Sequence, residues 1–199
     1  MKKFLPLILA GFSILLFVGL ILKHEDHLAN SQSIFVELAP VDPRSILQGD
    51  YMALNYELHF EGDAEADRGE EGGLPDKKIA ALEKRIQDQT HLLSYVQLDD
   101  QHRVIQTGLD ENLLKTHPGT SARLLLKNPS NRLANLYPAA NSFMFAEGLE
   151  PCYRNAKYAE IKVKDNGQAL LANLVDQNLR DLNCGWCIKK YAKKKQVEF

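Results

Sequence analysis

Apolar and polar residues alternate along residues 50–60, so that every second side chain after Asp50 is large and apolar. A period of two is typical of a β-strand, because successive side chains leave a strand on opposite faces. The pattern therefore predicts a strand with one buried face. We expect Leu54 and Tyr56 to fill the core from that face. Tyr51 is expected to leave on the other side, where it is the best candidate for contact with a partner.

A short turn over residues 40–44 precedes this strand and contains Pro40 and Pro43. Asp50 lies at the end of the apolar face, where a buried carboxylate needs a partner. Arg44 is the nearest candidate, so we predict that Asp50 holds Arg44 and the turn. Gly49 suits a backbone conformation that other residues avoid. The residues to which we assign structural roles on these grounds are Asp42, Pro43, Arg44, Gly49 and Asp50.

The N-terminal part of the chain carries an uncharged run of 19 residues, from Phe4 to Leu22. That length can cross the hydrocarbon core of a bilayer as a helix. Lys2 and Lys3 precede the run and favour a cytoplasmic N-terminus. A cleaved signal peptide would normally have a shorter apolar region and a small-x-small cleavage site, which is poorly matched here. We therefore predict an uncleaved transmembrane anchor over residues 1–23 and a linker over residues 24–33.

Seven further short apolar runs, separated by turn residues, predict additional strands. An Asn166-Gly167 pair between the last two is a strong hairpin signal. The predicted fold is mainly β: an antiparallel β-sandwich or partly open barrel with one or two added helices, over residues 34–182. The predicted strands cover residues 34–38, 92–98, 103–109, 122–127, 142–146, 158–163 and 168–175.

Residues 61–90 differ in composition from the strands around them. Six acidic residues and four glycines crowd residues 61–73, which predicts a solvated loop. Ile79, Leu82 and Ile86 then recur at helical spacing, which predicts an amphipathic helix over residues 74–89. Its apolar face must pack on the domain or on a partner. We interpret the whole stretch as an insertion at the end of a hairpin.

A basic tail with two of the three cysteines ends the chain. Cys184 and Cys187 form a C-x-x-C within residues 183–199, and neighbouring lysines would lower a thiol pKa. A thioredoxin-like site would follow a strand in a βαβ unit, which the pattern does not show. Outside the cytoplasm, Cys152, Cys184 and Cys187 most simply give one structural disulfide and one spare thiol. We predict no metal and no cofactor, since no set of four zinc ligands is evident.

The motif residues also carry a family resemblance. Gly49, Asp50, Tyr51, Leu54 and Tyr56 fill every fixed position of the pattern that names the GDYxxLxY family. The turn over residues 40–44, the Glu147-Gly148 pair and residues 156–160 and 165–167 are similar to other parts of the family pattern. The resemblance covers residues 35–174. It implies a membrane-anchored bacterial protein with a single anchor and an extracytoplasmic β-rich domain, and it supplies no catalytic residues.

These observations favour a non-enzymatic envelope protein. The formal net charge of −2 predicts no nucleic-acid partner. We expect a single-pass protein of the bacterial inner membrane, with its N-terminus in the cytoplasm and its main domain in the periplasm or otherwise outside the cytoplasm. The expected partners are the lipid bilayer and another inner-membrane protein.

Two enzymatic alternatives remain open. Ser45 shortly before Gly49-Asp50 resembles the nucleophile region of signal-peptidase-like serine proteases, although no lysine base follows in the next strand. The second alternative is a thiol-disulfide protein that uses Cys184 and Cys187.

Overall fold

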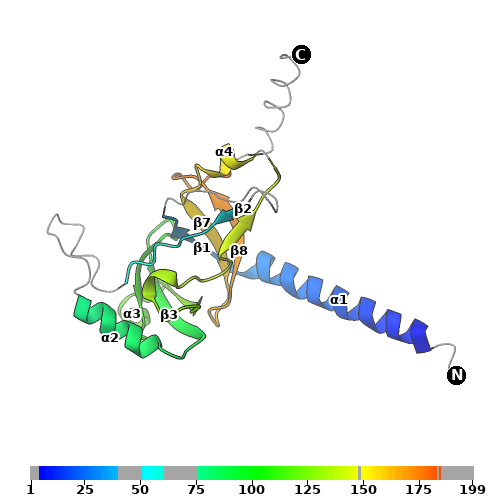
Figure 1. Cartoon of the computed structure of the whole chain (residues 1–199), viewed down its shortest axis with the longest axis horizontal. Helices are drawn as coiled ribbons and strands as arrows, with labels where there is room; N and C mark the ends of the chain where they lie inside the picture. The colour runs from blue at the N-terminus through cyan, green and yellow to red at the C-terminus, as the bar shows by residue number, and fades with distance from the viewer. Residues whose placement is uncertain (1–4, 40–50, 61–75, 148, 183, 185–199) are drawn as a thin grey trace, which may run out of the picture.

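The computed structural model describes residues 5–39, 51–60, 76–147, 149–182 and 184. Within them the chain forms eight β-strands and four α-helices (Figure 1). The helices are α1 (Leu5–Asn30), α2 (Asp76–Ile86), α3 (Asn112–Thr116) and α4 (Glu150–Tyr153). The strands are β1 (Gln32–Glu37), β2 (Tyr51–Ala53), β3 (His91–Leu98), β4 (Val104–Gly108), β5 (Ser121–Lys127), β6 (Ser142–Met144), β7 (Tyr158–Val163) and β8 (Ala169–Val175).

The strands form three small antiparallel sheets, which confirms the prediction of a mainly β, antiparallel fold with a few helices. One sheet has the order β1-β7-β8, the second has the order β4-β3-β5, and β2 pairs with β6 alone. Each pairing follows the register that places apolar side chains on one face, as in the Ile34–Ile161 pair of β1 and β7. Burial alternates along β1, β3 and β7, which gives their sheets one buried face.

The three sheets share one hydrophobic core. Its side chains come from every sheet and from the segment that follows β2. The largest fully buried apolar residues are Ile34, Val36, Ile86, Val96, Leu124, Leu126, Ile161 and Leu174.

The turn between β7 and β8 holds two of the sheets together. Gly167 has a φ of +85°, a backbone conformation that residues other than glycine rarely adopt. Its carbonyl accepts a hydrogen bond of 2.8 Å from the Leu125 amide of β5. A Cβ atom at this position would lie 3.2 Å from the Leu125 nitrogen, so glycine permits the close approach. The predicted hairpin is confirmed, and its Asn166-Gly167 pair also joins this turn to the neighbouring sheet.

The predicted amphipathic helix is confirmed as α2, although it is shorter than residues 74–89. Ile86 is fully buried, and Ile79 and Leu82 pack against the core. The Asn128 side-chain amide donates to the carbonyls of Ile86 and Gln89, at 2.9 and 2.8 Å. These bonds satisfy backbone acceptors that a helix end leaves free. The apolar face of the helix therefore packs on the domain.

Helix α1 is longer than the predicted anchor. It continues through residues 23–30, and β1 begins at Gln32, so the linker predicted over residues 24–33 is instead helix and strand. His27 explains the continuation, because it is buried and its Nε2 lies 3.2 Å from the Lys162 carbonyl oxygen of β7. The last turns of α1 contact β7 and β8, and the rest of the helix projects away from the domain as a rod (Figure 1).

The transmembrane prediction is not confirmed. Among the residues that the structure describes, no helix combines the length and the apolar character that crossing a membrane requires.

The strand predicted over residues 50–60 is shorter than expected. Only β2 is regular strand, but the predicted alternation of burial is confirmed over residues 51–60, which we call the motif segment. The segment changes partner as it advances. Leu54 N–H donates to the Asn141 carbonyl after β2 leaves β6, Glu57 N–H donates to the Glu37 carbonyl of β1, and the His59 carbonyl accepts from Thr107 N–H of β4. Because no single strand accompanies it, the segment cannot form one long ladder.

Candidate functional site

Several predicted site residues lie outside the described residues. They are Asp42, Pro43, Arg44, Ser45, Gly49, Asp50 and Cys187. The proposed contact between Asp50 and Arg44 therefore stays a prediction. The motif residues that the structure places are Tyr51, Leu54 and Tyr56, and it brings all three onto the motif segment.

Tyr56 anchors the motif segment in the core. Its ring is buried, and its hydroxyl donates a hydrogen bond of 2.6 Å to the carbonyl of Ala140. Burial raises the pKa of the Tyr56 phenol well above its ordinary value, because the apolar surroundings disfavour the charged form. Leu54 is buried beside it in the same core. Both side chains therefore have the structural role that their parity predicts.

Tyr51 lies on the other side of β2, as its position in the strand predicts. It is half-buried and pairs directly with Met144 of β6. Residues opposite each other in an antiparallel pair project from the same face. Met144 is 74% exposed, the highest value among the large hydrophobic side chains of the described residues. Tyr51 and Met144 together form an apolar surface patch, which we call the Tyr51–Met144 patch.

A polar cluster lies farther along the motif segment, on the side away from the core. Glu57 and His59 meet Glu37, the last residue of β1, and one ligand atom of each lies within 4.8 Å of the others. The pairing of the backbones brings them together, since Glu57 N–H donates to the Glu37 carbonyl at 2.9 Å. Two carboxylates and one imidazole are ligands that a divalent cation such as zinc accepts.

Lys157 already neutralises part of this cluster. Its Nζ lies 2.8 Å from Glu37 Oε1, whereas His59 Nε2 lies 3.9 Å from Glu37 Oε2. The hydrogen bond to Glu37 raises the pKa of Lys157, and the charges of Glu37 and Glu57 act in the same direction. A metal ion at this position would have to share the Glu37 carboxylate with the ammonium group of Lys157. The arrangement can thus act as a surface ion-pair network without any metal.

The sequence analysis did not identify the cluster, although part of the signal was present. Glu57 and His59 occupy the odd positions of residues 50–60, so they had to share one face of the segment. Glu37 and Lys157 come from distant parts of the chain, and no local pattern links them to that face.

Comparison with known proteins assigns the sequence to a family. The family model described as "GDYXXLXY protein" matches residues 13–174, from within α1 to within β8. The chain belongs to the GDYXXLXY family. No curated protein and no solved structure matches it.

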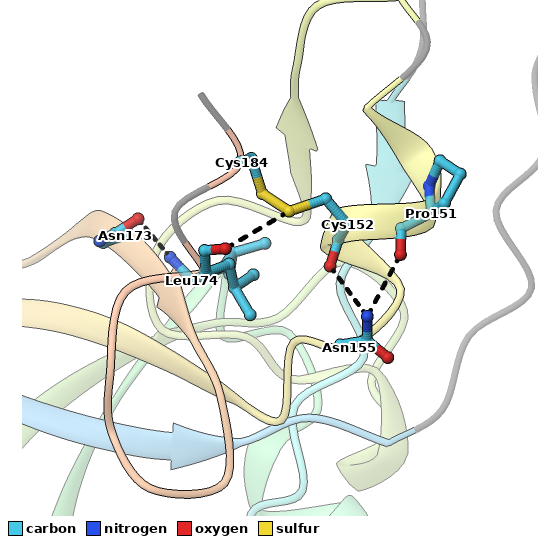
Figure 2. The surroundings of a disulfide bond; sticks show 7 residues. Pro151, Cys152, Asn155, Asn173, Leu174 and Cys184 are labelled. Carbon is cyan, nitrogen blue, oxygen red and sulfur yellow. Dashed lines mark hydrogen bonds between the residues drawn. A yellow bond between two sulfur atoms is a disulfide. The ribbon is translucent and has the colours of Figure 1, made fainter. Parts of the chain in front are cut away.

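This GDYXXLXY protein also contains a disulfide bond. It joins Cys152 of α4 to Cys184, with the two Cα atoms 5.7 Å apart (Figure 2). Both cysteines are buried, and Leu149, Phe145, Tyr153 and Leu182 pack around them. Cys152 Sγ also lies 3.5 Å from the Leu182 carbonyl oxygen, a contact in which the sulfur has no hydrogen to donate. Cys184 lies beyond the residues that the GDYXXLXY model matches, so the bond ties this part of the chain to the family domain.

The pairing of Cys152 with Cys184 gives a direct test of the role of the cysteines. The two residues are 32 positions apart, and closing a loop of that length stabilises a fold by about 3–4 kcal/mol. Cys152→Ser should lower the free energy of unfolding by about that amount. Cys187→Ser, the matched control, should leave the free energy of unfolding and the Cys152–Cys184 cross-link unchanged. The measurements are chemical denaturation and a peptide map without reductant. A Cys184–Cys187 bond in the peptide map of the unmodified protein would show instead that the C-x-x-C is the true pair.

Tyr56 generates a prediction about alkaline pH. Its raised pKa means that the folded protein keeps the phenol proton where an unfolded tyrosine, with a pKa of about 10, has lost it. Stability that this tyrosine contributes is therefore fully present below about pH 10 and is lost as the pH rises further. In Tyr56→Phe, the free energy of unfolding should be lower by about 1 kcal/mol at neutral pH, where a hydrogen bond is lost. It should then fall less steeply than that of the unmodified protein above about pH 10.

The matched control for this measurement is Tyr95→Phe, in a half-buried tyrosine of β3. The control should follow the unmodified protein across the alkaline range. An identical alkaline slope in Tyr56→Phe and the unmodified protein would contradict the burial of the Tyr56 phenol.

Proposed function

We propose that this GDYXXLXY protein is a non-enzymatic envelope protein of the bacterial inner membrane. In this proposal α1 is a single-pass anchor with its N-terminus in the cytoplasm. The β domain lies outside the cytoplasm and serves as an accessory partner of another membrane protein.

The observation that carries the proposal is the exposed apolar surface of α1. Large hydrophobic side chains between Leu9 and Leu22 are 45–72% exposed, and they occur on consecutive positions from Ile14 to Val18. Consecutive residues of a helix point in different directions, so this surface surrounds the helix. A helix that is apolar on all sides belongs in a protein core or in a membrane. The uncharged run begins at Phe4, which lies outside the described residues. Its length of 19 residues is therefore taken from the sequence.

The compartment is supported by a separate observation. A buried disulfide joins Cys152 and Cys184, and such bonds persist in oxidising compartments and are rare in the cytosol. Lys2 and Lys3 favour a cytoplasmic start of the helix, which directs the other end across the membrane. The disulfide also weakens the thiol-disulfide alternative, because Cys184 is bonded to Cys152 and both sulfur atoms are buried. The protease alternative depends on Ser45, which lies outside the described residues.

The Tyr51–Met144 patch supports the accessory role. It combines the exposed Met144 with the half-buried Tyr51 of the family motif, beside core residues that hold its backbone in place. Exposed aromatic residues and methionine are enriched where proteins contact one another. A partner anchored in the same membrane would meet this patch at a raised local concentration.

The anchor is tested by a double substitution in α1. Phe12→Arg with Leu16→Arg places two charges in the proposed span, each costing about 2.5–3.5 kcal/mol in a bilayer. We expect this variant to leave the membrane fraction under alkaline carbonate. A reporter that is active only outside the cytoplasm, fused after Phe199, should lose its activity.

Ile105→Arg is the matched control, since Ile105 of β4 is 47% exposed and Leu16 is 49% exposed. This control should remain membrane-bound with an active reporter. Extraction of the unmodified protein from membranes by alkaline carbonate would contradict the proposed anchor.

The accessory role is tested by replacing Met144 with a photo-crosslinking amino acid. The same replacement at Ile105 is the control. Cells that contain the Met144 probe should give a discrete adduct with one membrane protein, and Tyr51→Ala should weaken that adduct severalfold. Equal cross-linking from Met144 and Ile105 would argue against a specific contact at the patch.

A further inference from the structure

A basic pocket lies where α1 meets the β domain. It has a volume of about 310 Å³ and is lined by the last turns of α1 together with residues of β3, β5 and the β7–β8 hairpin. Three lysines and three histidines line it, and none of the described aspartates or glutamates does. These six residues are Lys23, His24, His27, His91, Lys127 and Lys164.

The α1 wall of the pocket is fixed to the domain. His27 is only 7% exposed, and its Nε2 lies 3.2 Å from the Lys162 carbonyl oxygen of β7. The same part of α1 also contacts β8. The pocket is therefore held open between two elements that contact each other directly.

The lysines of the pocket keep their charge available. Lys127 Nζ donates to the Ala139 carbonyl at 2.9 Å and lies 5.5 Å from the centre of the Tyr137 ring, neither of which neutralises it. Lys23 and Lys164 form no ion pair with any described residue. Asp26 and Asp165 line a neighbouring hollow that Lys164 also borders, but they do not line this pocket. Three positive charges thus converge on one concave site, which suits a group with negative charge.

Apart from Gln168, the other residues that line the pocket are apolar. Lysines beside apolar side chains favour a ligand that carries both negative charge and hydrocarbon. Leu20, Leu125 and Leu170 line the pocket beside the lysines. Leu20 belongs to the uncharged run, and Lys23 is the first charged residue after it. If α1 crosses the membrane, this junction lies at the level of the lipid headgroups, where lysine side chains reach toward phosphate.

We propose that this pocket binds the phosphate group of an anionic glycerophospholipid, with the lysines on the phosphate and the leucines beside the start of the acyl chains. The proposal rests on the membrane anchor of the previous section for its source of ligand. The chemistry that would recognise a free phosphate ion is the same, so the test must separate the two sources.

The test uses the full chain in a neutral detergent, where the protein stays in solution whether or not α1 is an anchor. Binding of dihexanoyl phosphatidylglycerol, dihexanoyl phosphatidylcholine and inorganic phosphate is measured by titration calorimetry. We expect phosphatidylglycerol to bind at least tenfold more tightly than either other probe. Lys23→Gln with Lys164→Gln should weaken that binding by about 25-fold, at roughly fivefold for each lysine near an anionic lipid.

Two control variants make the result specific to the pocket. Lys84→Gln with Lys115→Gln removes the same charge from exposed positions on α2 and α3, and it should leave the affinity unchanged. Lys23→Arg with Lys164→Arg keeps the charge and should retain most of the binding, which guards against misfolding as the cause of a loss.

Three results would overturn the proposal: equal affinity for the two lipids, equal loss in the pocket and control variants, or inorganic phosphate binding as tightly as phosphatidylglycerol. Such a result in a protein that still resists carbonate extraction would remove the lipid site and leave the proposed anchor intact.

Discussion

The motif segment is the constraint on which the rest of the domain depends. Over residues 51–60 its backbone bonds in turn to β6 through β2, to β1 and to β4, so it connects all three sheets. Every second side chain along it is buried in the shared core, including Leu54 and Tyr56. Each sheet is small, and small sheets need a common hydrophobic core to be stable. The segment supplies both the core side chains and the backbone bonds that hold the sheets around it.

The same alternation gives the segment an outer face. Tyr51 joins Met144 in an exposed patch, while Glu57 and His59 meet Glu37 in a polar cluster. The family motif therefore has buried side chains, Leu54 and Tyr56, on one face, and the half-buried Tyr51 on the other. Helix α1, the disulfide and the basic pocket lie elsewhere on the molecule, and the disulfide adds a covalent link between α4 and Cys184.

Local pattern was enough to predict much of this fold. The strand periodicities, the Asn166-Gly167 hairpin and the apolar face of α2 are properties of neighbouring residues, and the structure confirms them. The features that could not be predicted are contacts between distant residues. They include the change of partner along the motif segment, the pairing of Glu37 with Lys157 and the choice of Cys152 as the partner of Cys184. The continuation of α1 beyond Lys23 belongs here too, because His27 is held by Lys162 of β7.

Native-state hydrogen exchange tests the central role of the motif segment most directly. The amides of Leu54, Glu57 and Thr107 donate the hydrogen bonds that join the segment to the rest of the domain. If the segment holds the sheets together, these amides should exchange only through global unfolding, as slowly as the most protected amides of β3 and β7. Faster exchange of all three through a local opening, while β3 and β7 stay protected, would contradict this account.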